Sequence, residues 1–135
     1  MESPNTAIRE TSAVPAAVEH DPVNHPSHYT NHPSGIECIT VTRLLGFDIG
    51  NATKYVWRRG DKGNAIQDLD KALFYLDDAC VHARRNRKVP RRAARLLFRV
   101  ADAEPDPLAA QFYRAVAHRR WHIATAMVQA LRYNA

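Results

Sequence analysis

The stretch from Asn64 to Ala83 constrains the fold most strongly, because its apolar residues recur at helical spacing. Intervals of three and four residues alternate along six positions: Ile66, Leu69, Leu73, Leu76, Cys80 and Ala83. A period of about 3.6 residues places such positions along one side of an α-helix. Asn64 followed by Gln67 adds the pattern of a helix start. The stretch therefore predicts a long amphipathic helix whose apolar side other elements must cover.

Capping residues predict four further helical regions. The predicted ranges are 34–45, 49–59, 91–103 and a last region from 107 onwards. Ser34 with Glu37 forms a capping-box pattern, and Asp48 is a good cap for the second helix. Asp106 is a suitable cap and Pro107 suits the first turn of the last region, which is either one long helix or two helices with a break near His118.

These elements predict an all-α fold, namely a small helical bundle with an ordered N-terminal loop and an added C-terminal helical hairpin. A chain of 135 residues is long enough for one ordinary domain. Within it we expect a disordered leader at 1–23, a nucleotide-binding helical core at 24–86, and a C-terminal helical extension at 87–135 packed on the core. The leader is rich in proline and small polar residues and has no helical periodicity.

Composition limits the location and the partners of the chain. No apolar run approaches the roughly 18 to 20 residues that a bilayer-crossing helix needs. The first residues show no basic patch followed by an apolar stretch, so we expect a cytoplasmic protein with no membrane partner. Cys38 and Cys80 lie in apolar helical patterns and are expected to be buried free thiols.

The net charge of +5 favours negatively charged partners, and its distribution is uneven. Eight basic residues form a block without a single acid: Arg84, Arg85, Arg87, Lys88, Arg91, Arg92, Arg95 and Arg99. The block could grip nucleic-acid phosphates. Alternatively, an arginine-rich genome supplies arginine wherever a surface position is free, and any nucleic-acid contact through Arg84–Arg99 is then weak.

The 49–59 helix carries the most informative polar residues. Asn51, Lys54, Tyr55 and Arg58 recur at intervals of three or four residues and so share one face. The charges of Lys54 and Arg58 lie one turn apart and repel each other unless an acid or an anion neutralises them. A phosphate suits this pair, because arginine offers a planar fork of donors and lysine a point charge. A plain solvated basic face is the alternative.

The 64–83 helix has a comparable polar face with Asp68, Lys71 and Tyr75. Asp68 could pair with Lys54 or Arg58, accept hydrogen bonds from a sugar or base, or accept a proton in a reaction. The turn between the two helices, residues 60–63, contains Lys62 between two glycines and could present backbone amides to an anion. More often, two such glycines merely end one helix and begin the next.

The loop before the first predicted helix contains His25, His28 and Tyr29. Together with His32 and Cys38 these residues make a zinc site conceivable, but their spacing matches no closed structural zinc pattern. We therefore expect no metal site. A histidine that donates to phosphate, with Tyr29 stacked on a base, fits the residue types better.

Several catalytic motifs are missing from the chain. It has no GxxxxGK[ST] phosphate-binding loop, no Gly-x-Ser-x-Gly elbow and no HExxH helix. The paired acidic motifs of all-α nucleotide pyrophosphatases are missing too. We expect no tightly bound cofactor, although Mg²⁺ can accompany a bound nucleotide.

Two strings resemble a known family: VNHPSHYTNHPSGIECI and GNATKYVWRRGDKGNAIQDLDKALFYL. They are similar to small phage and prophage proteins of a domain family of unknown function, whose best-known member is a coliphage nucleotide kinase that lacks a P-loop. The resemblance covers about residues 23–77 and includes five ordered blocks: HPxHY, GIExI, GNxxKYxWR, GxKG and DLxKAxxYL. Thr53 and Phe74 depart mildly from the family pattern, and the region after residue 84 has no counterpart in it.

The resemblance implies phosphoryl transfer from a nucleoside triphosphate to a deoxynucleoside monophosphate of the dTMP or dGMP class. It also implies a homo-oligomer in the cytoplasm of a bacterial host, during phage infection or from a prophage. The residues carried over are His25, His28, Tyr29, Glu37, Asn51, Lys54, Tyr55, Arg58, Lys62, Asp68, Lys71 and Tyr75. Among these, Lys54, Arg58 and Lys62 are expected to bind phosphate, and the catalytic residues His28 or Asp68 to orient the acceptor. A protein that binds or sequesters a nucleotide without chemistry is the first alternative, and a nucleic-acid-binding accessory protein is the second.

Overall fold

The computed structural model describes residues 23, 31–61 and 63–135. The predicted leader except its last residue, Val23, and four site residues, His25, His28, Tyr29 and Lys62, lie outside the described residues. Within them the prediction of an all-α fold is confirmed, because every regular element is a helix. The elements are α2 (Cys38–Thr42), α3 (Phe47–Arg58), α4 (Ala65–Val81), the 3₁₀ turn η1 (Arg84–Arg87), α5 (Arg91–Ala103), α6 (Pro107–Ala117) and α7 (Trp121–Tyr133).

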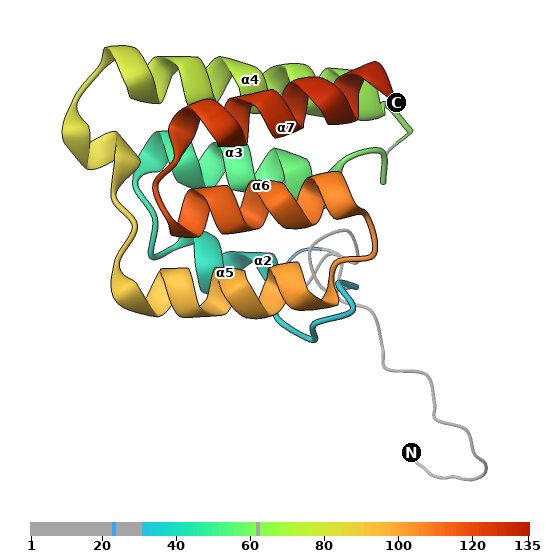
Figure 1. Cartoon of the computed structure of the whole chain (residues 1–135), viewed down its shortest axis with the longest axis horizontal. Coiled ribbons are helices and arrows are strands. Elements are labelled where there is room, and N and C mark those ends of the chain that lie inside the picture. Colours follow the sequence, from blue (N-terminus) through green and yellow to red (C-terminus); the bar gives the residue numbers. More distant parts are fainter. Residues whose placement is uncertain (1–22, 24–30, 62) are drawn as a thin grey trace, which may run out of the picture.

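The helices form two layers (Figure 1). One layer contains α4, α3 and α2, and the other contains α7, α6 and α5. Helix α6 packs between α5 and α7, while α4 meets α7 at one edge of the bundle. The core between the layers includes the fully buried side chains of Ile49, Phe112 and Tyr113. This arrangement buries the inner side of α3 and leaves its opposite side on the outside of the molecule.

Three predicted features of helix ends are confirmed, two caps and one break. The Asn64 side chain accepts a hydrogen bond from the Gln67 amide at 2.9 Å and caps α4. The Asp106 carboxylate accepts from the Leu108 amide at 2.9 Å, and the proline that follows it opens α6. The last helical region breaks where expected, because α6 ends at Ala117 and α7 begins at Trp121.

The predicted start of the first two helices is wrong. The Ser34 hydroxyl accepts from the Ile36 amide at 3.1 Å, within a turn, and α2 begins only after Glu37 and is short. Glu37 is the N-cap residue of α2 but makes no side-chain capping bond. Gly46, rather than Asp48, is the N-cap residue of α3, and Asp48 lies buried in the first turn. The Ser34 hydroxyl is used within the turn, and Asp48 cannot cap α3 because the helix already begins at Phe47.

The predicted apolar side of α4 is correct only in part. Leu69 and Leu76 are buried, whereas Ile66 is 42% exposed and the Cys80 thiol is exposed. Helix α4 is covered by both α3 and α7, so its buried side is completed by two small residues, Ala72 and Ala79. Small side chains allow the close approach of neighbouring helices, and the apolar spacing alone does not distinguish them from larger residues. The expectation that Cys80 is buried is therefore wrong, while Cys38 is buried as expected.

None of the helices among the described residues combines the length and the apolar character that a bilayer-spanning segment requires.

Candidate functional site

The outer side of α3 and the adjoining side of α4 carry most of the described site residues. We call this surface the cationic face; its members are Asn51, Lys54, Tyr55, Arg58, Lys71 and Tyr75. The opposite side of α3 is buried as expected through Ile49, Ala52, Thr53 and Val56. Because α3 and α4 pack directly against each other, residues from both helices meet on this face.

The ring of Tyr55 lies at the centre of the cationic face. The Lys54 Nζ atom lies 4.6 Å from the ring centroid, and the Lys71 Nζ atom lies 5.3 Å from it. The guanidinium carbon of Arg58 lies 5.7 Å from the same centroid. Cations within about 6 Å of an aromatic ring are attracted by its electron-rich face. Tyr55 therefore gathers three positive charges from two helices around one point.

Neither lysine on this face has an acidic partner among the described residues. Ion pairs in that part of the chain involve other basic groups, including Arg58, whose Nε atom lies 3.4 Å from an Asp68 carboxylate oxygen. Neighbouring positive charges without an acidic partner repel each other and raise the free energy of the folded protein, and a bound anion relieves this repulsion. The lysines are thus the groups on this face that are available to an anionic ligand.

Aromatic rings extend from Tyr55 along the surface. The rings of Tyr55 and Tyr75 are stacked at 6.1 Å and 6°. Phe47 and Phe74 each contact Tyr75 edge-on, at 5.9 and 5.3 Å, and both phenylalanines are largely exposed. Exposed aromatic rings beside lysines provide stacking surfaces for a planar base next to ligands for its phosphate.

Asp68 is buried and already engaged. Its carboxylate pairs with Arg58 and accepts a hydrogen bond from the Gly60 amide at 3.2 Å. Its side chain is 4% exposed, against 17% for Arg58. The predicted pairing with Arg58 is thus present, and Asp68 holds both that guanidinium and the turn after α3. The other two predicted roles of Asp68 stay predictions.

A hollow of about 210 Å³ lies between α2 and α3, beside the cationic face. Its lining includes Lys54, Asn51, Phe47, Ile39 and Arg43. The Asn51 amide donates to the Phe47 carbonyl at 2.9 Å and is thereby oriented along its own helix. Lys54 lies near the buried Cys38 thiol, whose pKa burial raises to about 12 although the lysine charge lowers it somewhat. Lys54 therefore connects this hollow with the Tyr55 ring.

A second polar cluster, at the far end of α3, was not predicted. His32 contacts Glu104 at 3.1 Å, and the other oxygen of that carboxylate lies 3.2 Å from the Arg59 guanidinium. His32 also packs against Trp57 and Tyr113. His32, Trp57, Arg59 and Glu104 border a cavity of about 420 Å³. The sequence offered one hint, because His32 belongs to the histidine-rich loop, but Glu104 lies far along the chain.

The burial of the Asp48 carboxyl, at the other end of α3, was also not predicted from the sequence. Asp48 is fully buried, and neither of its oxygens has a hydrogen-bond partner among the described residues. Burial and then the nearby Asp78 carboxyl raise the pKa of Asp48 to about 6. His82 and Asn86 act in the opposite direction on the same pKa. Ionisation of the Asp48 carboxyl therefore lowers the stability of the folded protein relative to the protonated form.

No group of three or more histidine, cysteine, aspartate or glutamate side chains in residues 23, 31–61 and 63–135 is arranged to hold a metal ion. His25 and His28 lie outside those residues. The described part of the candidate site therefore consists of cations, amides and aromatic rings.

Comparison with known families gives a match over the first helices of the chain. Residues 23–77 match the model of a family described as a protein of unknown function (DUF3310). The match covers less than half of the chain and ends within α4. No curated protein and no solved structure matches the chain. All twelve predicted site residues fall inside the matched region, while η1, α5, α6 and α7 lie outside it.

Proposed function

We propose that this protein binds a deoxynucleoside monophosphate of the dTMP or dGMP class on the cationic face and phosphorylates it from a nucleoside triphosphate. The observation that carries the proposal is the position of Lys54 and Lys71, from different helices, around one tyrosine ring without an acidic partner among the described residues. The resemblance of residues 23–77 to P-loop-less nucleotide kinases supplies the reaction.

The described residues have distinct parts in this proposal. Lys54 and Lys71 neutralise phosphate oxygens, and Arg58 adds a fork of donors whose direction Asp68 holds. Phosphoryl transfer depends mainly on positioning and on neutralising the charge of the equatorial oxygens, which suits a site made of cations. Phe47, Phe74 and the stacked tyrosines provide apolar surface for the base.

Magnesium and subunit number remain part of the proposal. Mg²⁺ enters with the triphosphate, since nucleotide phosphates themselves provide oxygen ligands for it. The proposal also includes a homo-oligomer in the bacterial cytoplasm, in which a second subunit presents its own cationic face.

A nucleotide-binding protein without catalysis is the second candidate, and the state of Asp68 favours it. The carboxylate is buried, paired with Arg58 and bonded to a backbone amide, so a substrate hydroxyl meets an occupied group. Without a free base, the same cations would bind a nucleotide and release it unchanged. The nucleotide would then be sequestered rather than converted.

Turnover and binding measurements separate the two candidates. We would incubate the protein with dTMP or dGMP, ATP and Mg²⁺ and follow diphosphate formation by chromatography, with thermal shift as the binding assay. A ligand at a hundred times its dissociation constant stabilises the fold by about 2.7 kcal/mol. Diphosphate formation supports the kinase, and stabilisation without turnover supports the binding protein. If no nucleotide stabilises the fold, both candidates are wrong.

A pair of charge-matched variants locates the site. Lys71→Gln should lower nucleotide affinity by about tenfold or more, because a charge-assisted contact contributes roughly 1.5–3 kcal/mol. Lys88→Gln removes the same charge from an exposed lysine outside the cationic face and should leave affinity within about twofold. Equal losses in both variants would show that only net charge matters and would remove the cationic face from the proposal.

A further inference from the structure

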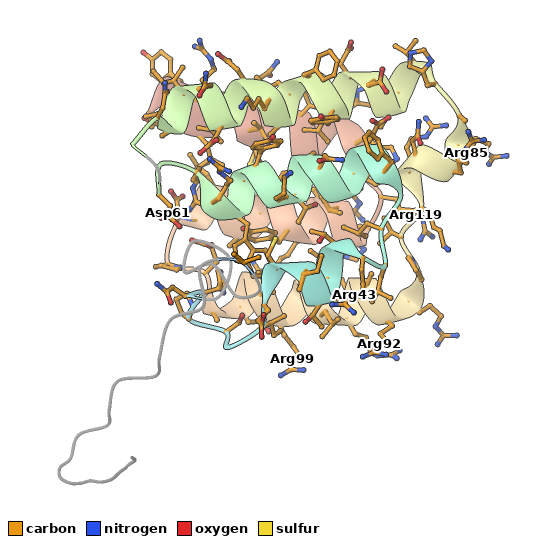
Figure 2. The ribbon with its side chains drawn as sticks, turned by 180° about the vertical axis from the view of Figure 1, so that it is seen from behind. Arg43, Asp61, Arg85, Arg92, Arg99 and Arg119 are labelled. Carbon is orange, nitrogen blue, oxygen red and sulfur yellow. The ribbon has the colours of Figure 1, made fainter. Side chains whose placement is uncertain are left out.

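The eight basic residues between α4 and the middle of α5 make up a charged stretch that the proposed nucleotide site does not use. We call it the basic band: Arg84, Arg85, Arg87, Lys88, Arg91, Arg92, Arg95 and Arg99. All are exposed except Arg87, which is half-buried. Figure 2 shows Arg85 and Arg119 toward the right-hand end of the molecule and Arg43, Arg92 and Arg99 toward its lower edge, whereas Asp61 lies at the left-hand end.

The band concentrates the charge of the whole chain. The sequence has 19 lysines and arginines and 14 acidic residues, so without the eight band residues it has 11 basic and 14 acidic residues and a net charge of −3. A general surplus of arginine would have raised the charge elsewhere as well. The net positive charge of this protein is therefore supplied by the eight residues of the band.

No side chain in the band forms an ion pair or a hydrogen bond with any residue that the structure describes. By contrast, two other exposed arginines are paired. Arg114 contacts Asp102 at 3.0 Å, and Arg132 contacts Asp70 through two nitrogen atoms. The guanidinium groups of the band are consequently available to an external polyanion.

The band is held in place by the fold. The Gly46 amide donates to the Lys88 carbonyl at 3.1 Å, and a β-carbon at position 46 would lie 2.2 Å from the Arg85 carbonyl oxygen. Four band residues lie on α5, at positions 91, 92, 95 and 99, within about 100° of the helix circumference at 3.6 residues per turn. They form a stripe along the outer side of a helix that lies at the edge of the bundle (Figure 1).

We propose that this band docks α5 on duplex DNA and contacts the phosphates on either side of the major groove. A helix with its side chains is about 10–12 Å wide, close to the width of about 12 Å of that groove in B-form DNA. Proteins that bind single strands stack the bases on aromatic side chains. None of the exposed large apolar residues among the described positions lies between 84 and 99, so the band lacks the stacking surface of a single-strand binder.

Fluorescence anisotropy with a labelled 20-base-pair DNA duplex tests the proposal, with salt as the variable. The decisive variant is Arg92→Gln/Arg99→Gln, and the matched control is Arg114→Gln/Arg132→Gln, which removes two arginines that are already paired. Each lost phosphate contact reduces the slope of log affinity against log salt by about 0.9, so we expect the band variant to lose about 1.8. At 100 mM NaCl its affinity should fall by about tenfold or more, and the control should change by less than about threefold.

Circular dichroism and thermal melting confirm that both variants are folded, and Arg91→Gln/Arg95→Gln provides a second band variant. A single strand of equal length, and an RNA duplex with its narrow major groove, should bind more weakly than the DNA duplex. The proposal is overturned if the protein does not bind the duplex at 50 mM NaCl, or if the control Arg114→Gln/Arg132→Gln loses as much affinity as the band variants. It is also overturned if the single strand or the RNA duplex binds as well as the DNA. A saturating deoxynucleoside monophosphate should not displace the duplex, which separates this result from the proposed nucleotide site.

Discussion

The cationic face and the basic band both present positive charge to solvent, but the surroundings of the charge differ. On the cationic face, three cations surround the ring of Tyr55, namely Lys54, Arg58 and Lys71. The buried Asp68 carboxylate forms an ion pair with Arg58. In the band, residues 84–99 include no exposed aromatic residue and no acid. The first arrangement suits a small ligand with a phosphate and a ring, and the second suits a long polymer of phosphates. Local shape and neighbours, rather than charge, distinguish the two surfaces.

The largest expected effect is a loss of folding stability when Asp68 is replaced. Asp68→Ala removes the acid and leaves the Arg58 guanidinium partly buried without its carboxylate. Breaking a buried ion pair from one side costs about 3–5 kcal/mol, and we expect a loss near the lower end because Arg58 is 17% exposed. Urea unfolding monitored by circular dichroism measures the loss. In the band, Arg95→Gln should change stability by less than about 0.5 kcal/mol. A similar loss in both variants would contradict the contrast between restrained and free cations.

Salt sharpens the comparison through the two proposed ligands. Raising NaCl from 50 to 200 mM should lower the affinity for duplex DNA by about a hundredfold if four phosphates are contacted. Nucleotide affinity should fall by less than about tenfold, because fewer charges are involved. Anisotropy for DNA and thermal shift for the nucleotide give the two values. If both ligands respond equally to salt, they share one surface.

A third prediction concerns pH and the end of α3 nearest the band. The folded-state pKa of Asp48 lies at about 6, above its ordinary value, so the protonated form stabilises the fold. This stabilisation is complete below the unfolded-state pKa and is lost as the pH rises through about 6. Wild-type stability should fall by on the order of 1 kcal/mol between pH 5 and 7.5, and Asp48→Asn should remove this fall. Unfolding free energies at pH 5 and 7.5 test it; a variant that retains the full pH dependence contradicts the assignment to Asp48.

The smallest effect concerns the repulsion within the cationic face. Lys71→Gln should raise the stability of the ligand-free protein by a few tenths of a kcal/mol, because it removes one of three positive charges around Tyr55 and neighbouring like charges on a helix surface destabilise by about that much. The same variant should gain less stability from a nucleotide than the wild type does. Differential scanning calorimetry with and without dTMP measures both. A ligand-free variant that is less stable than the wild type would mean that the Lys71 charge stabilises this face through its contact with Tyr55.

The sequence predicted those parts of the molecule that depend on local periodicity and caps. The extent of α5, the Asn64 and Asp106 caps and the break near His118 all follow from neighbouring residues, and all are confirmed. The shared outer face of Lys54, Tyr55 and Arg58 followed from helical spacing in the same way. Ser34 and Asp48 were misassigned as caps because each has another contact or location that depends on the folded chain.

The contacts that join distant segments could not be predicted from spacing. The bond between His32 and Glu104 spans the two layers, and nothing local to either residue announces it. The exposure of Cys80 follows from the position of α7 against α4, which the apolar pattern of α4 does not contain. The availability of the band also needed the structure, since unpaired arginines are recognised only when their neighbours are known.

The tight contact at Gly46 has a geometric consequence for the two proposed ligands. The backbone of η1 lies so close to this glycine that the start of α3 and the band cannot slide past each other without losing the bond between Gly46 and Lys88. A duplex on the band and a nucleotide on the cationic face would therefore keep one separation and one mutual orientation. A residue with a β-carbon at position 46 would push η1 away from the start of α3 and so change the relative position of the two surfaces.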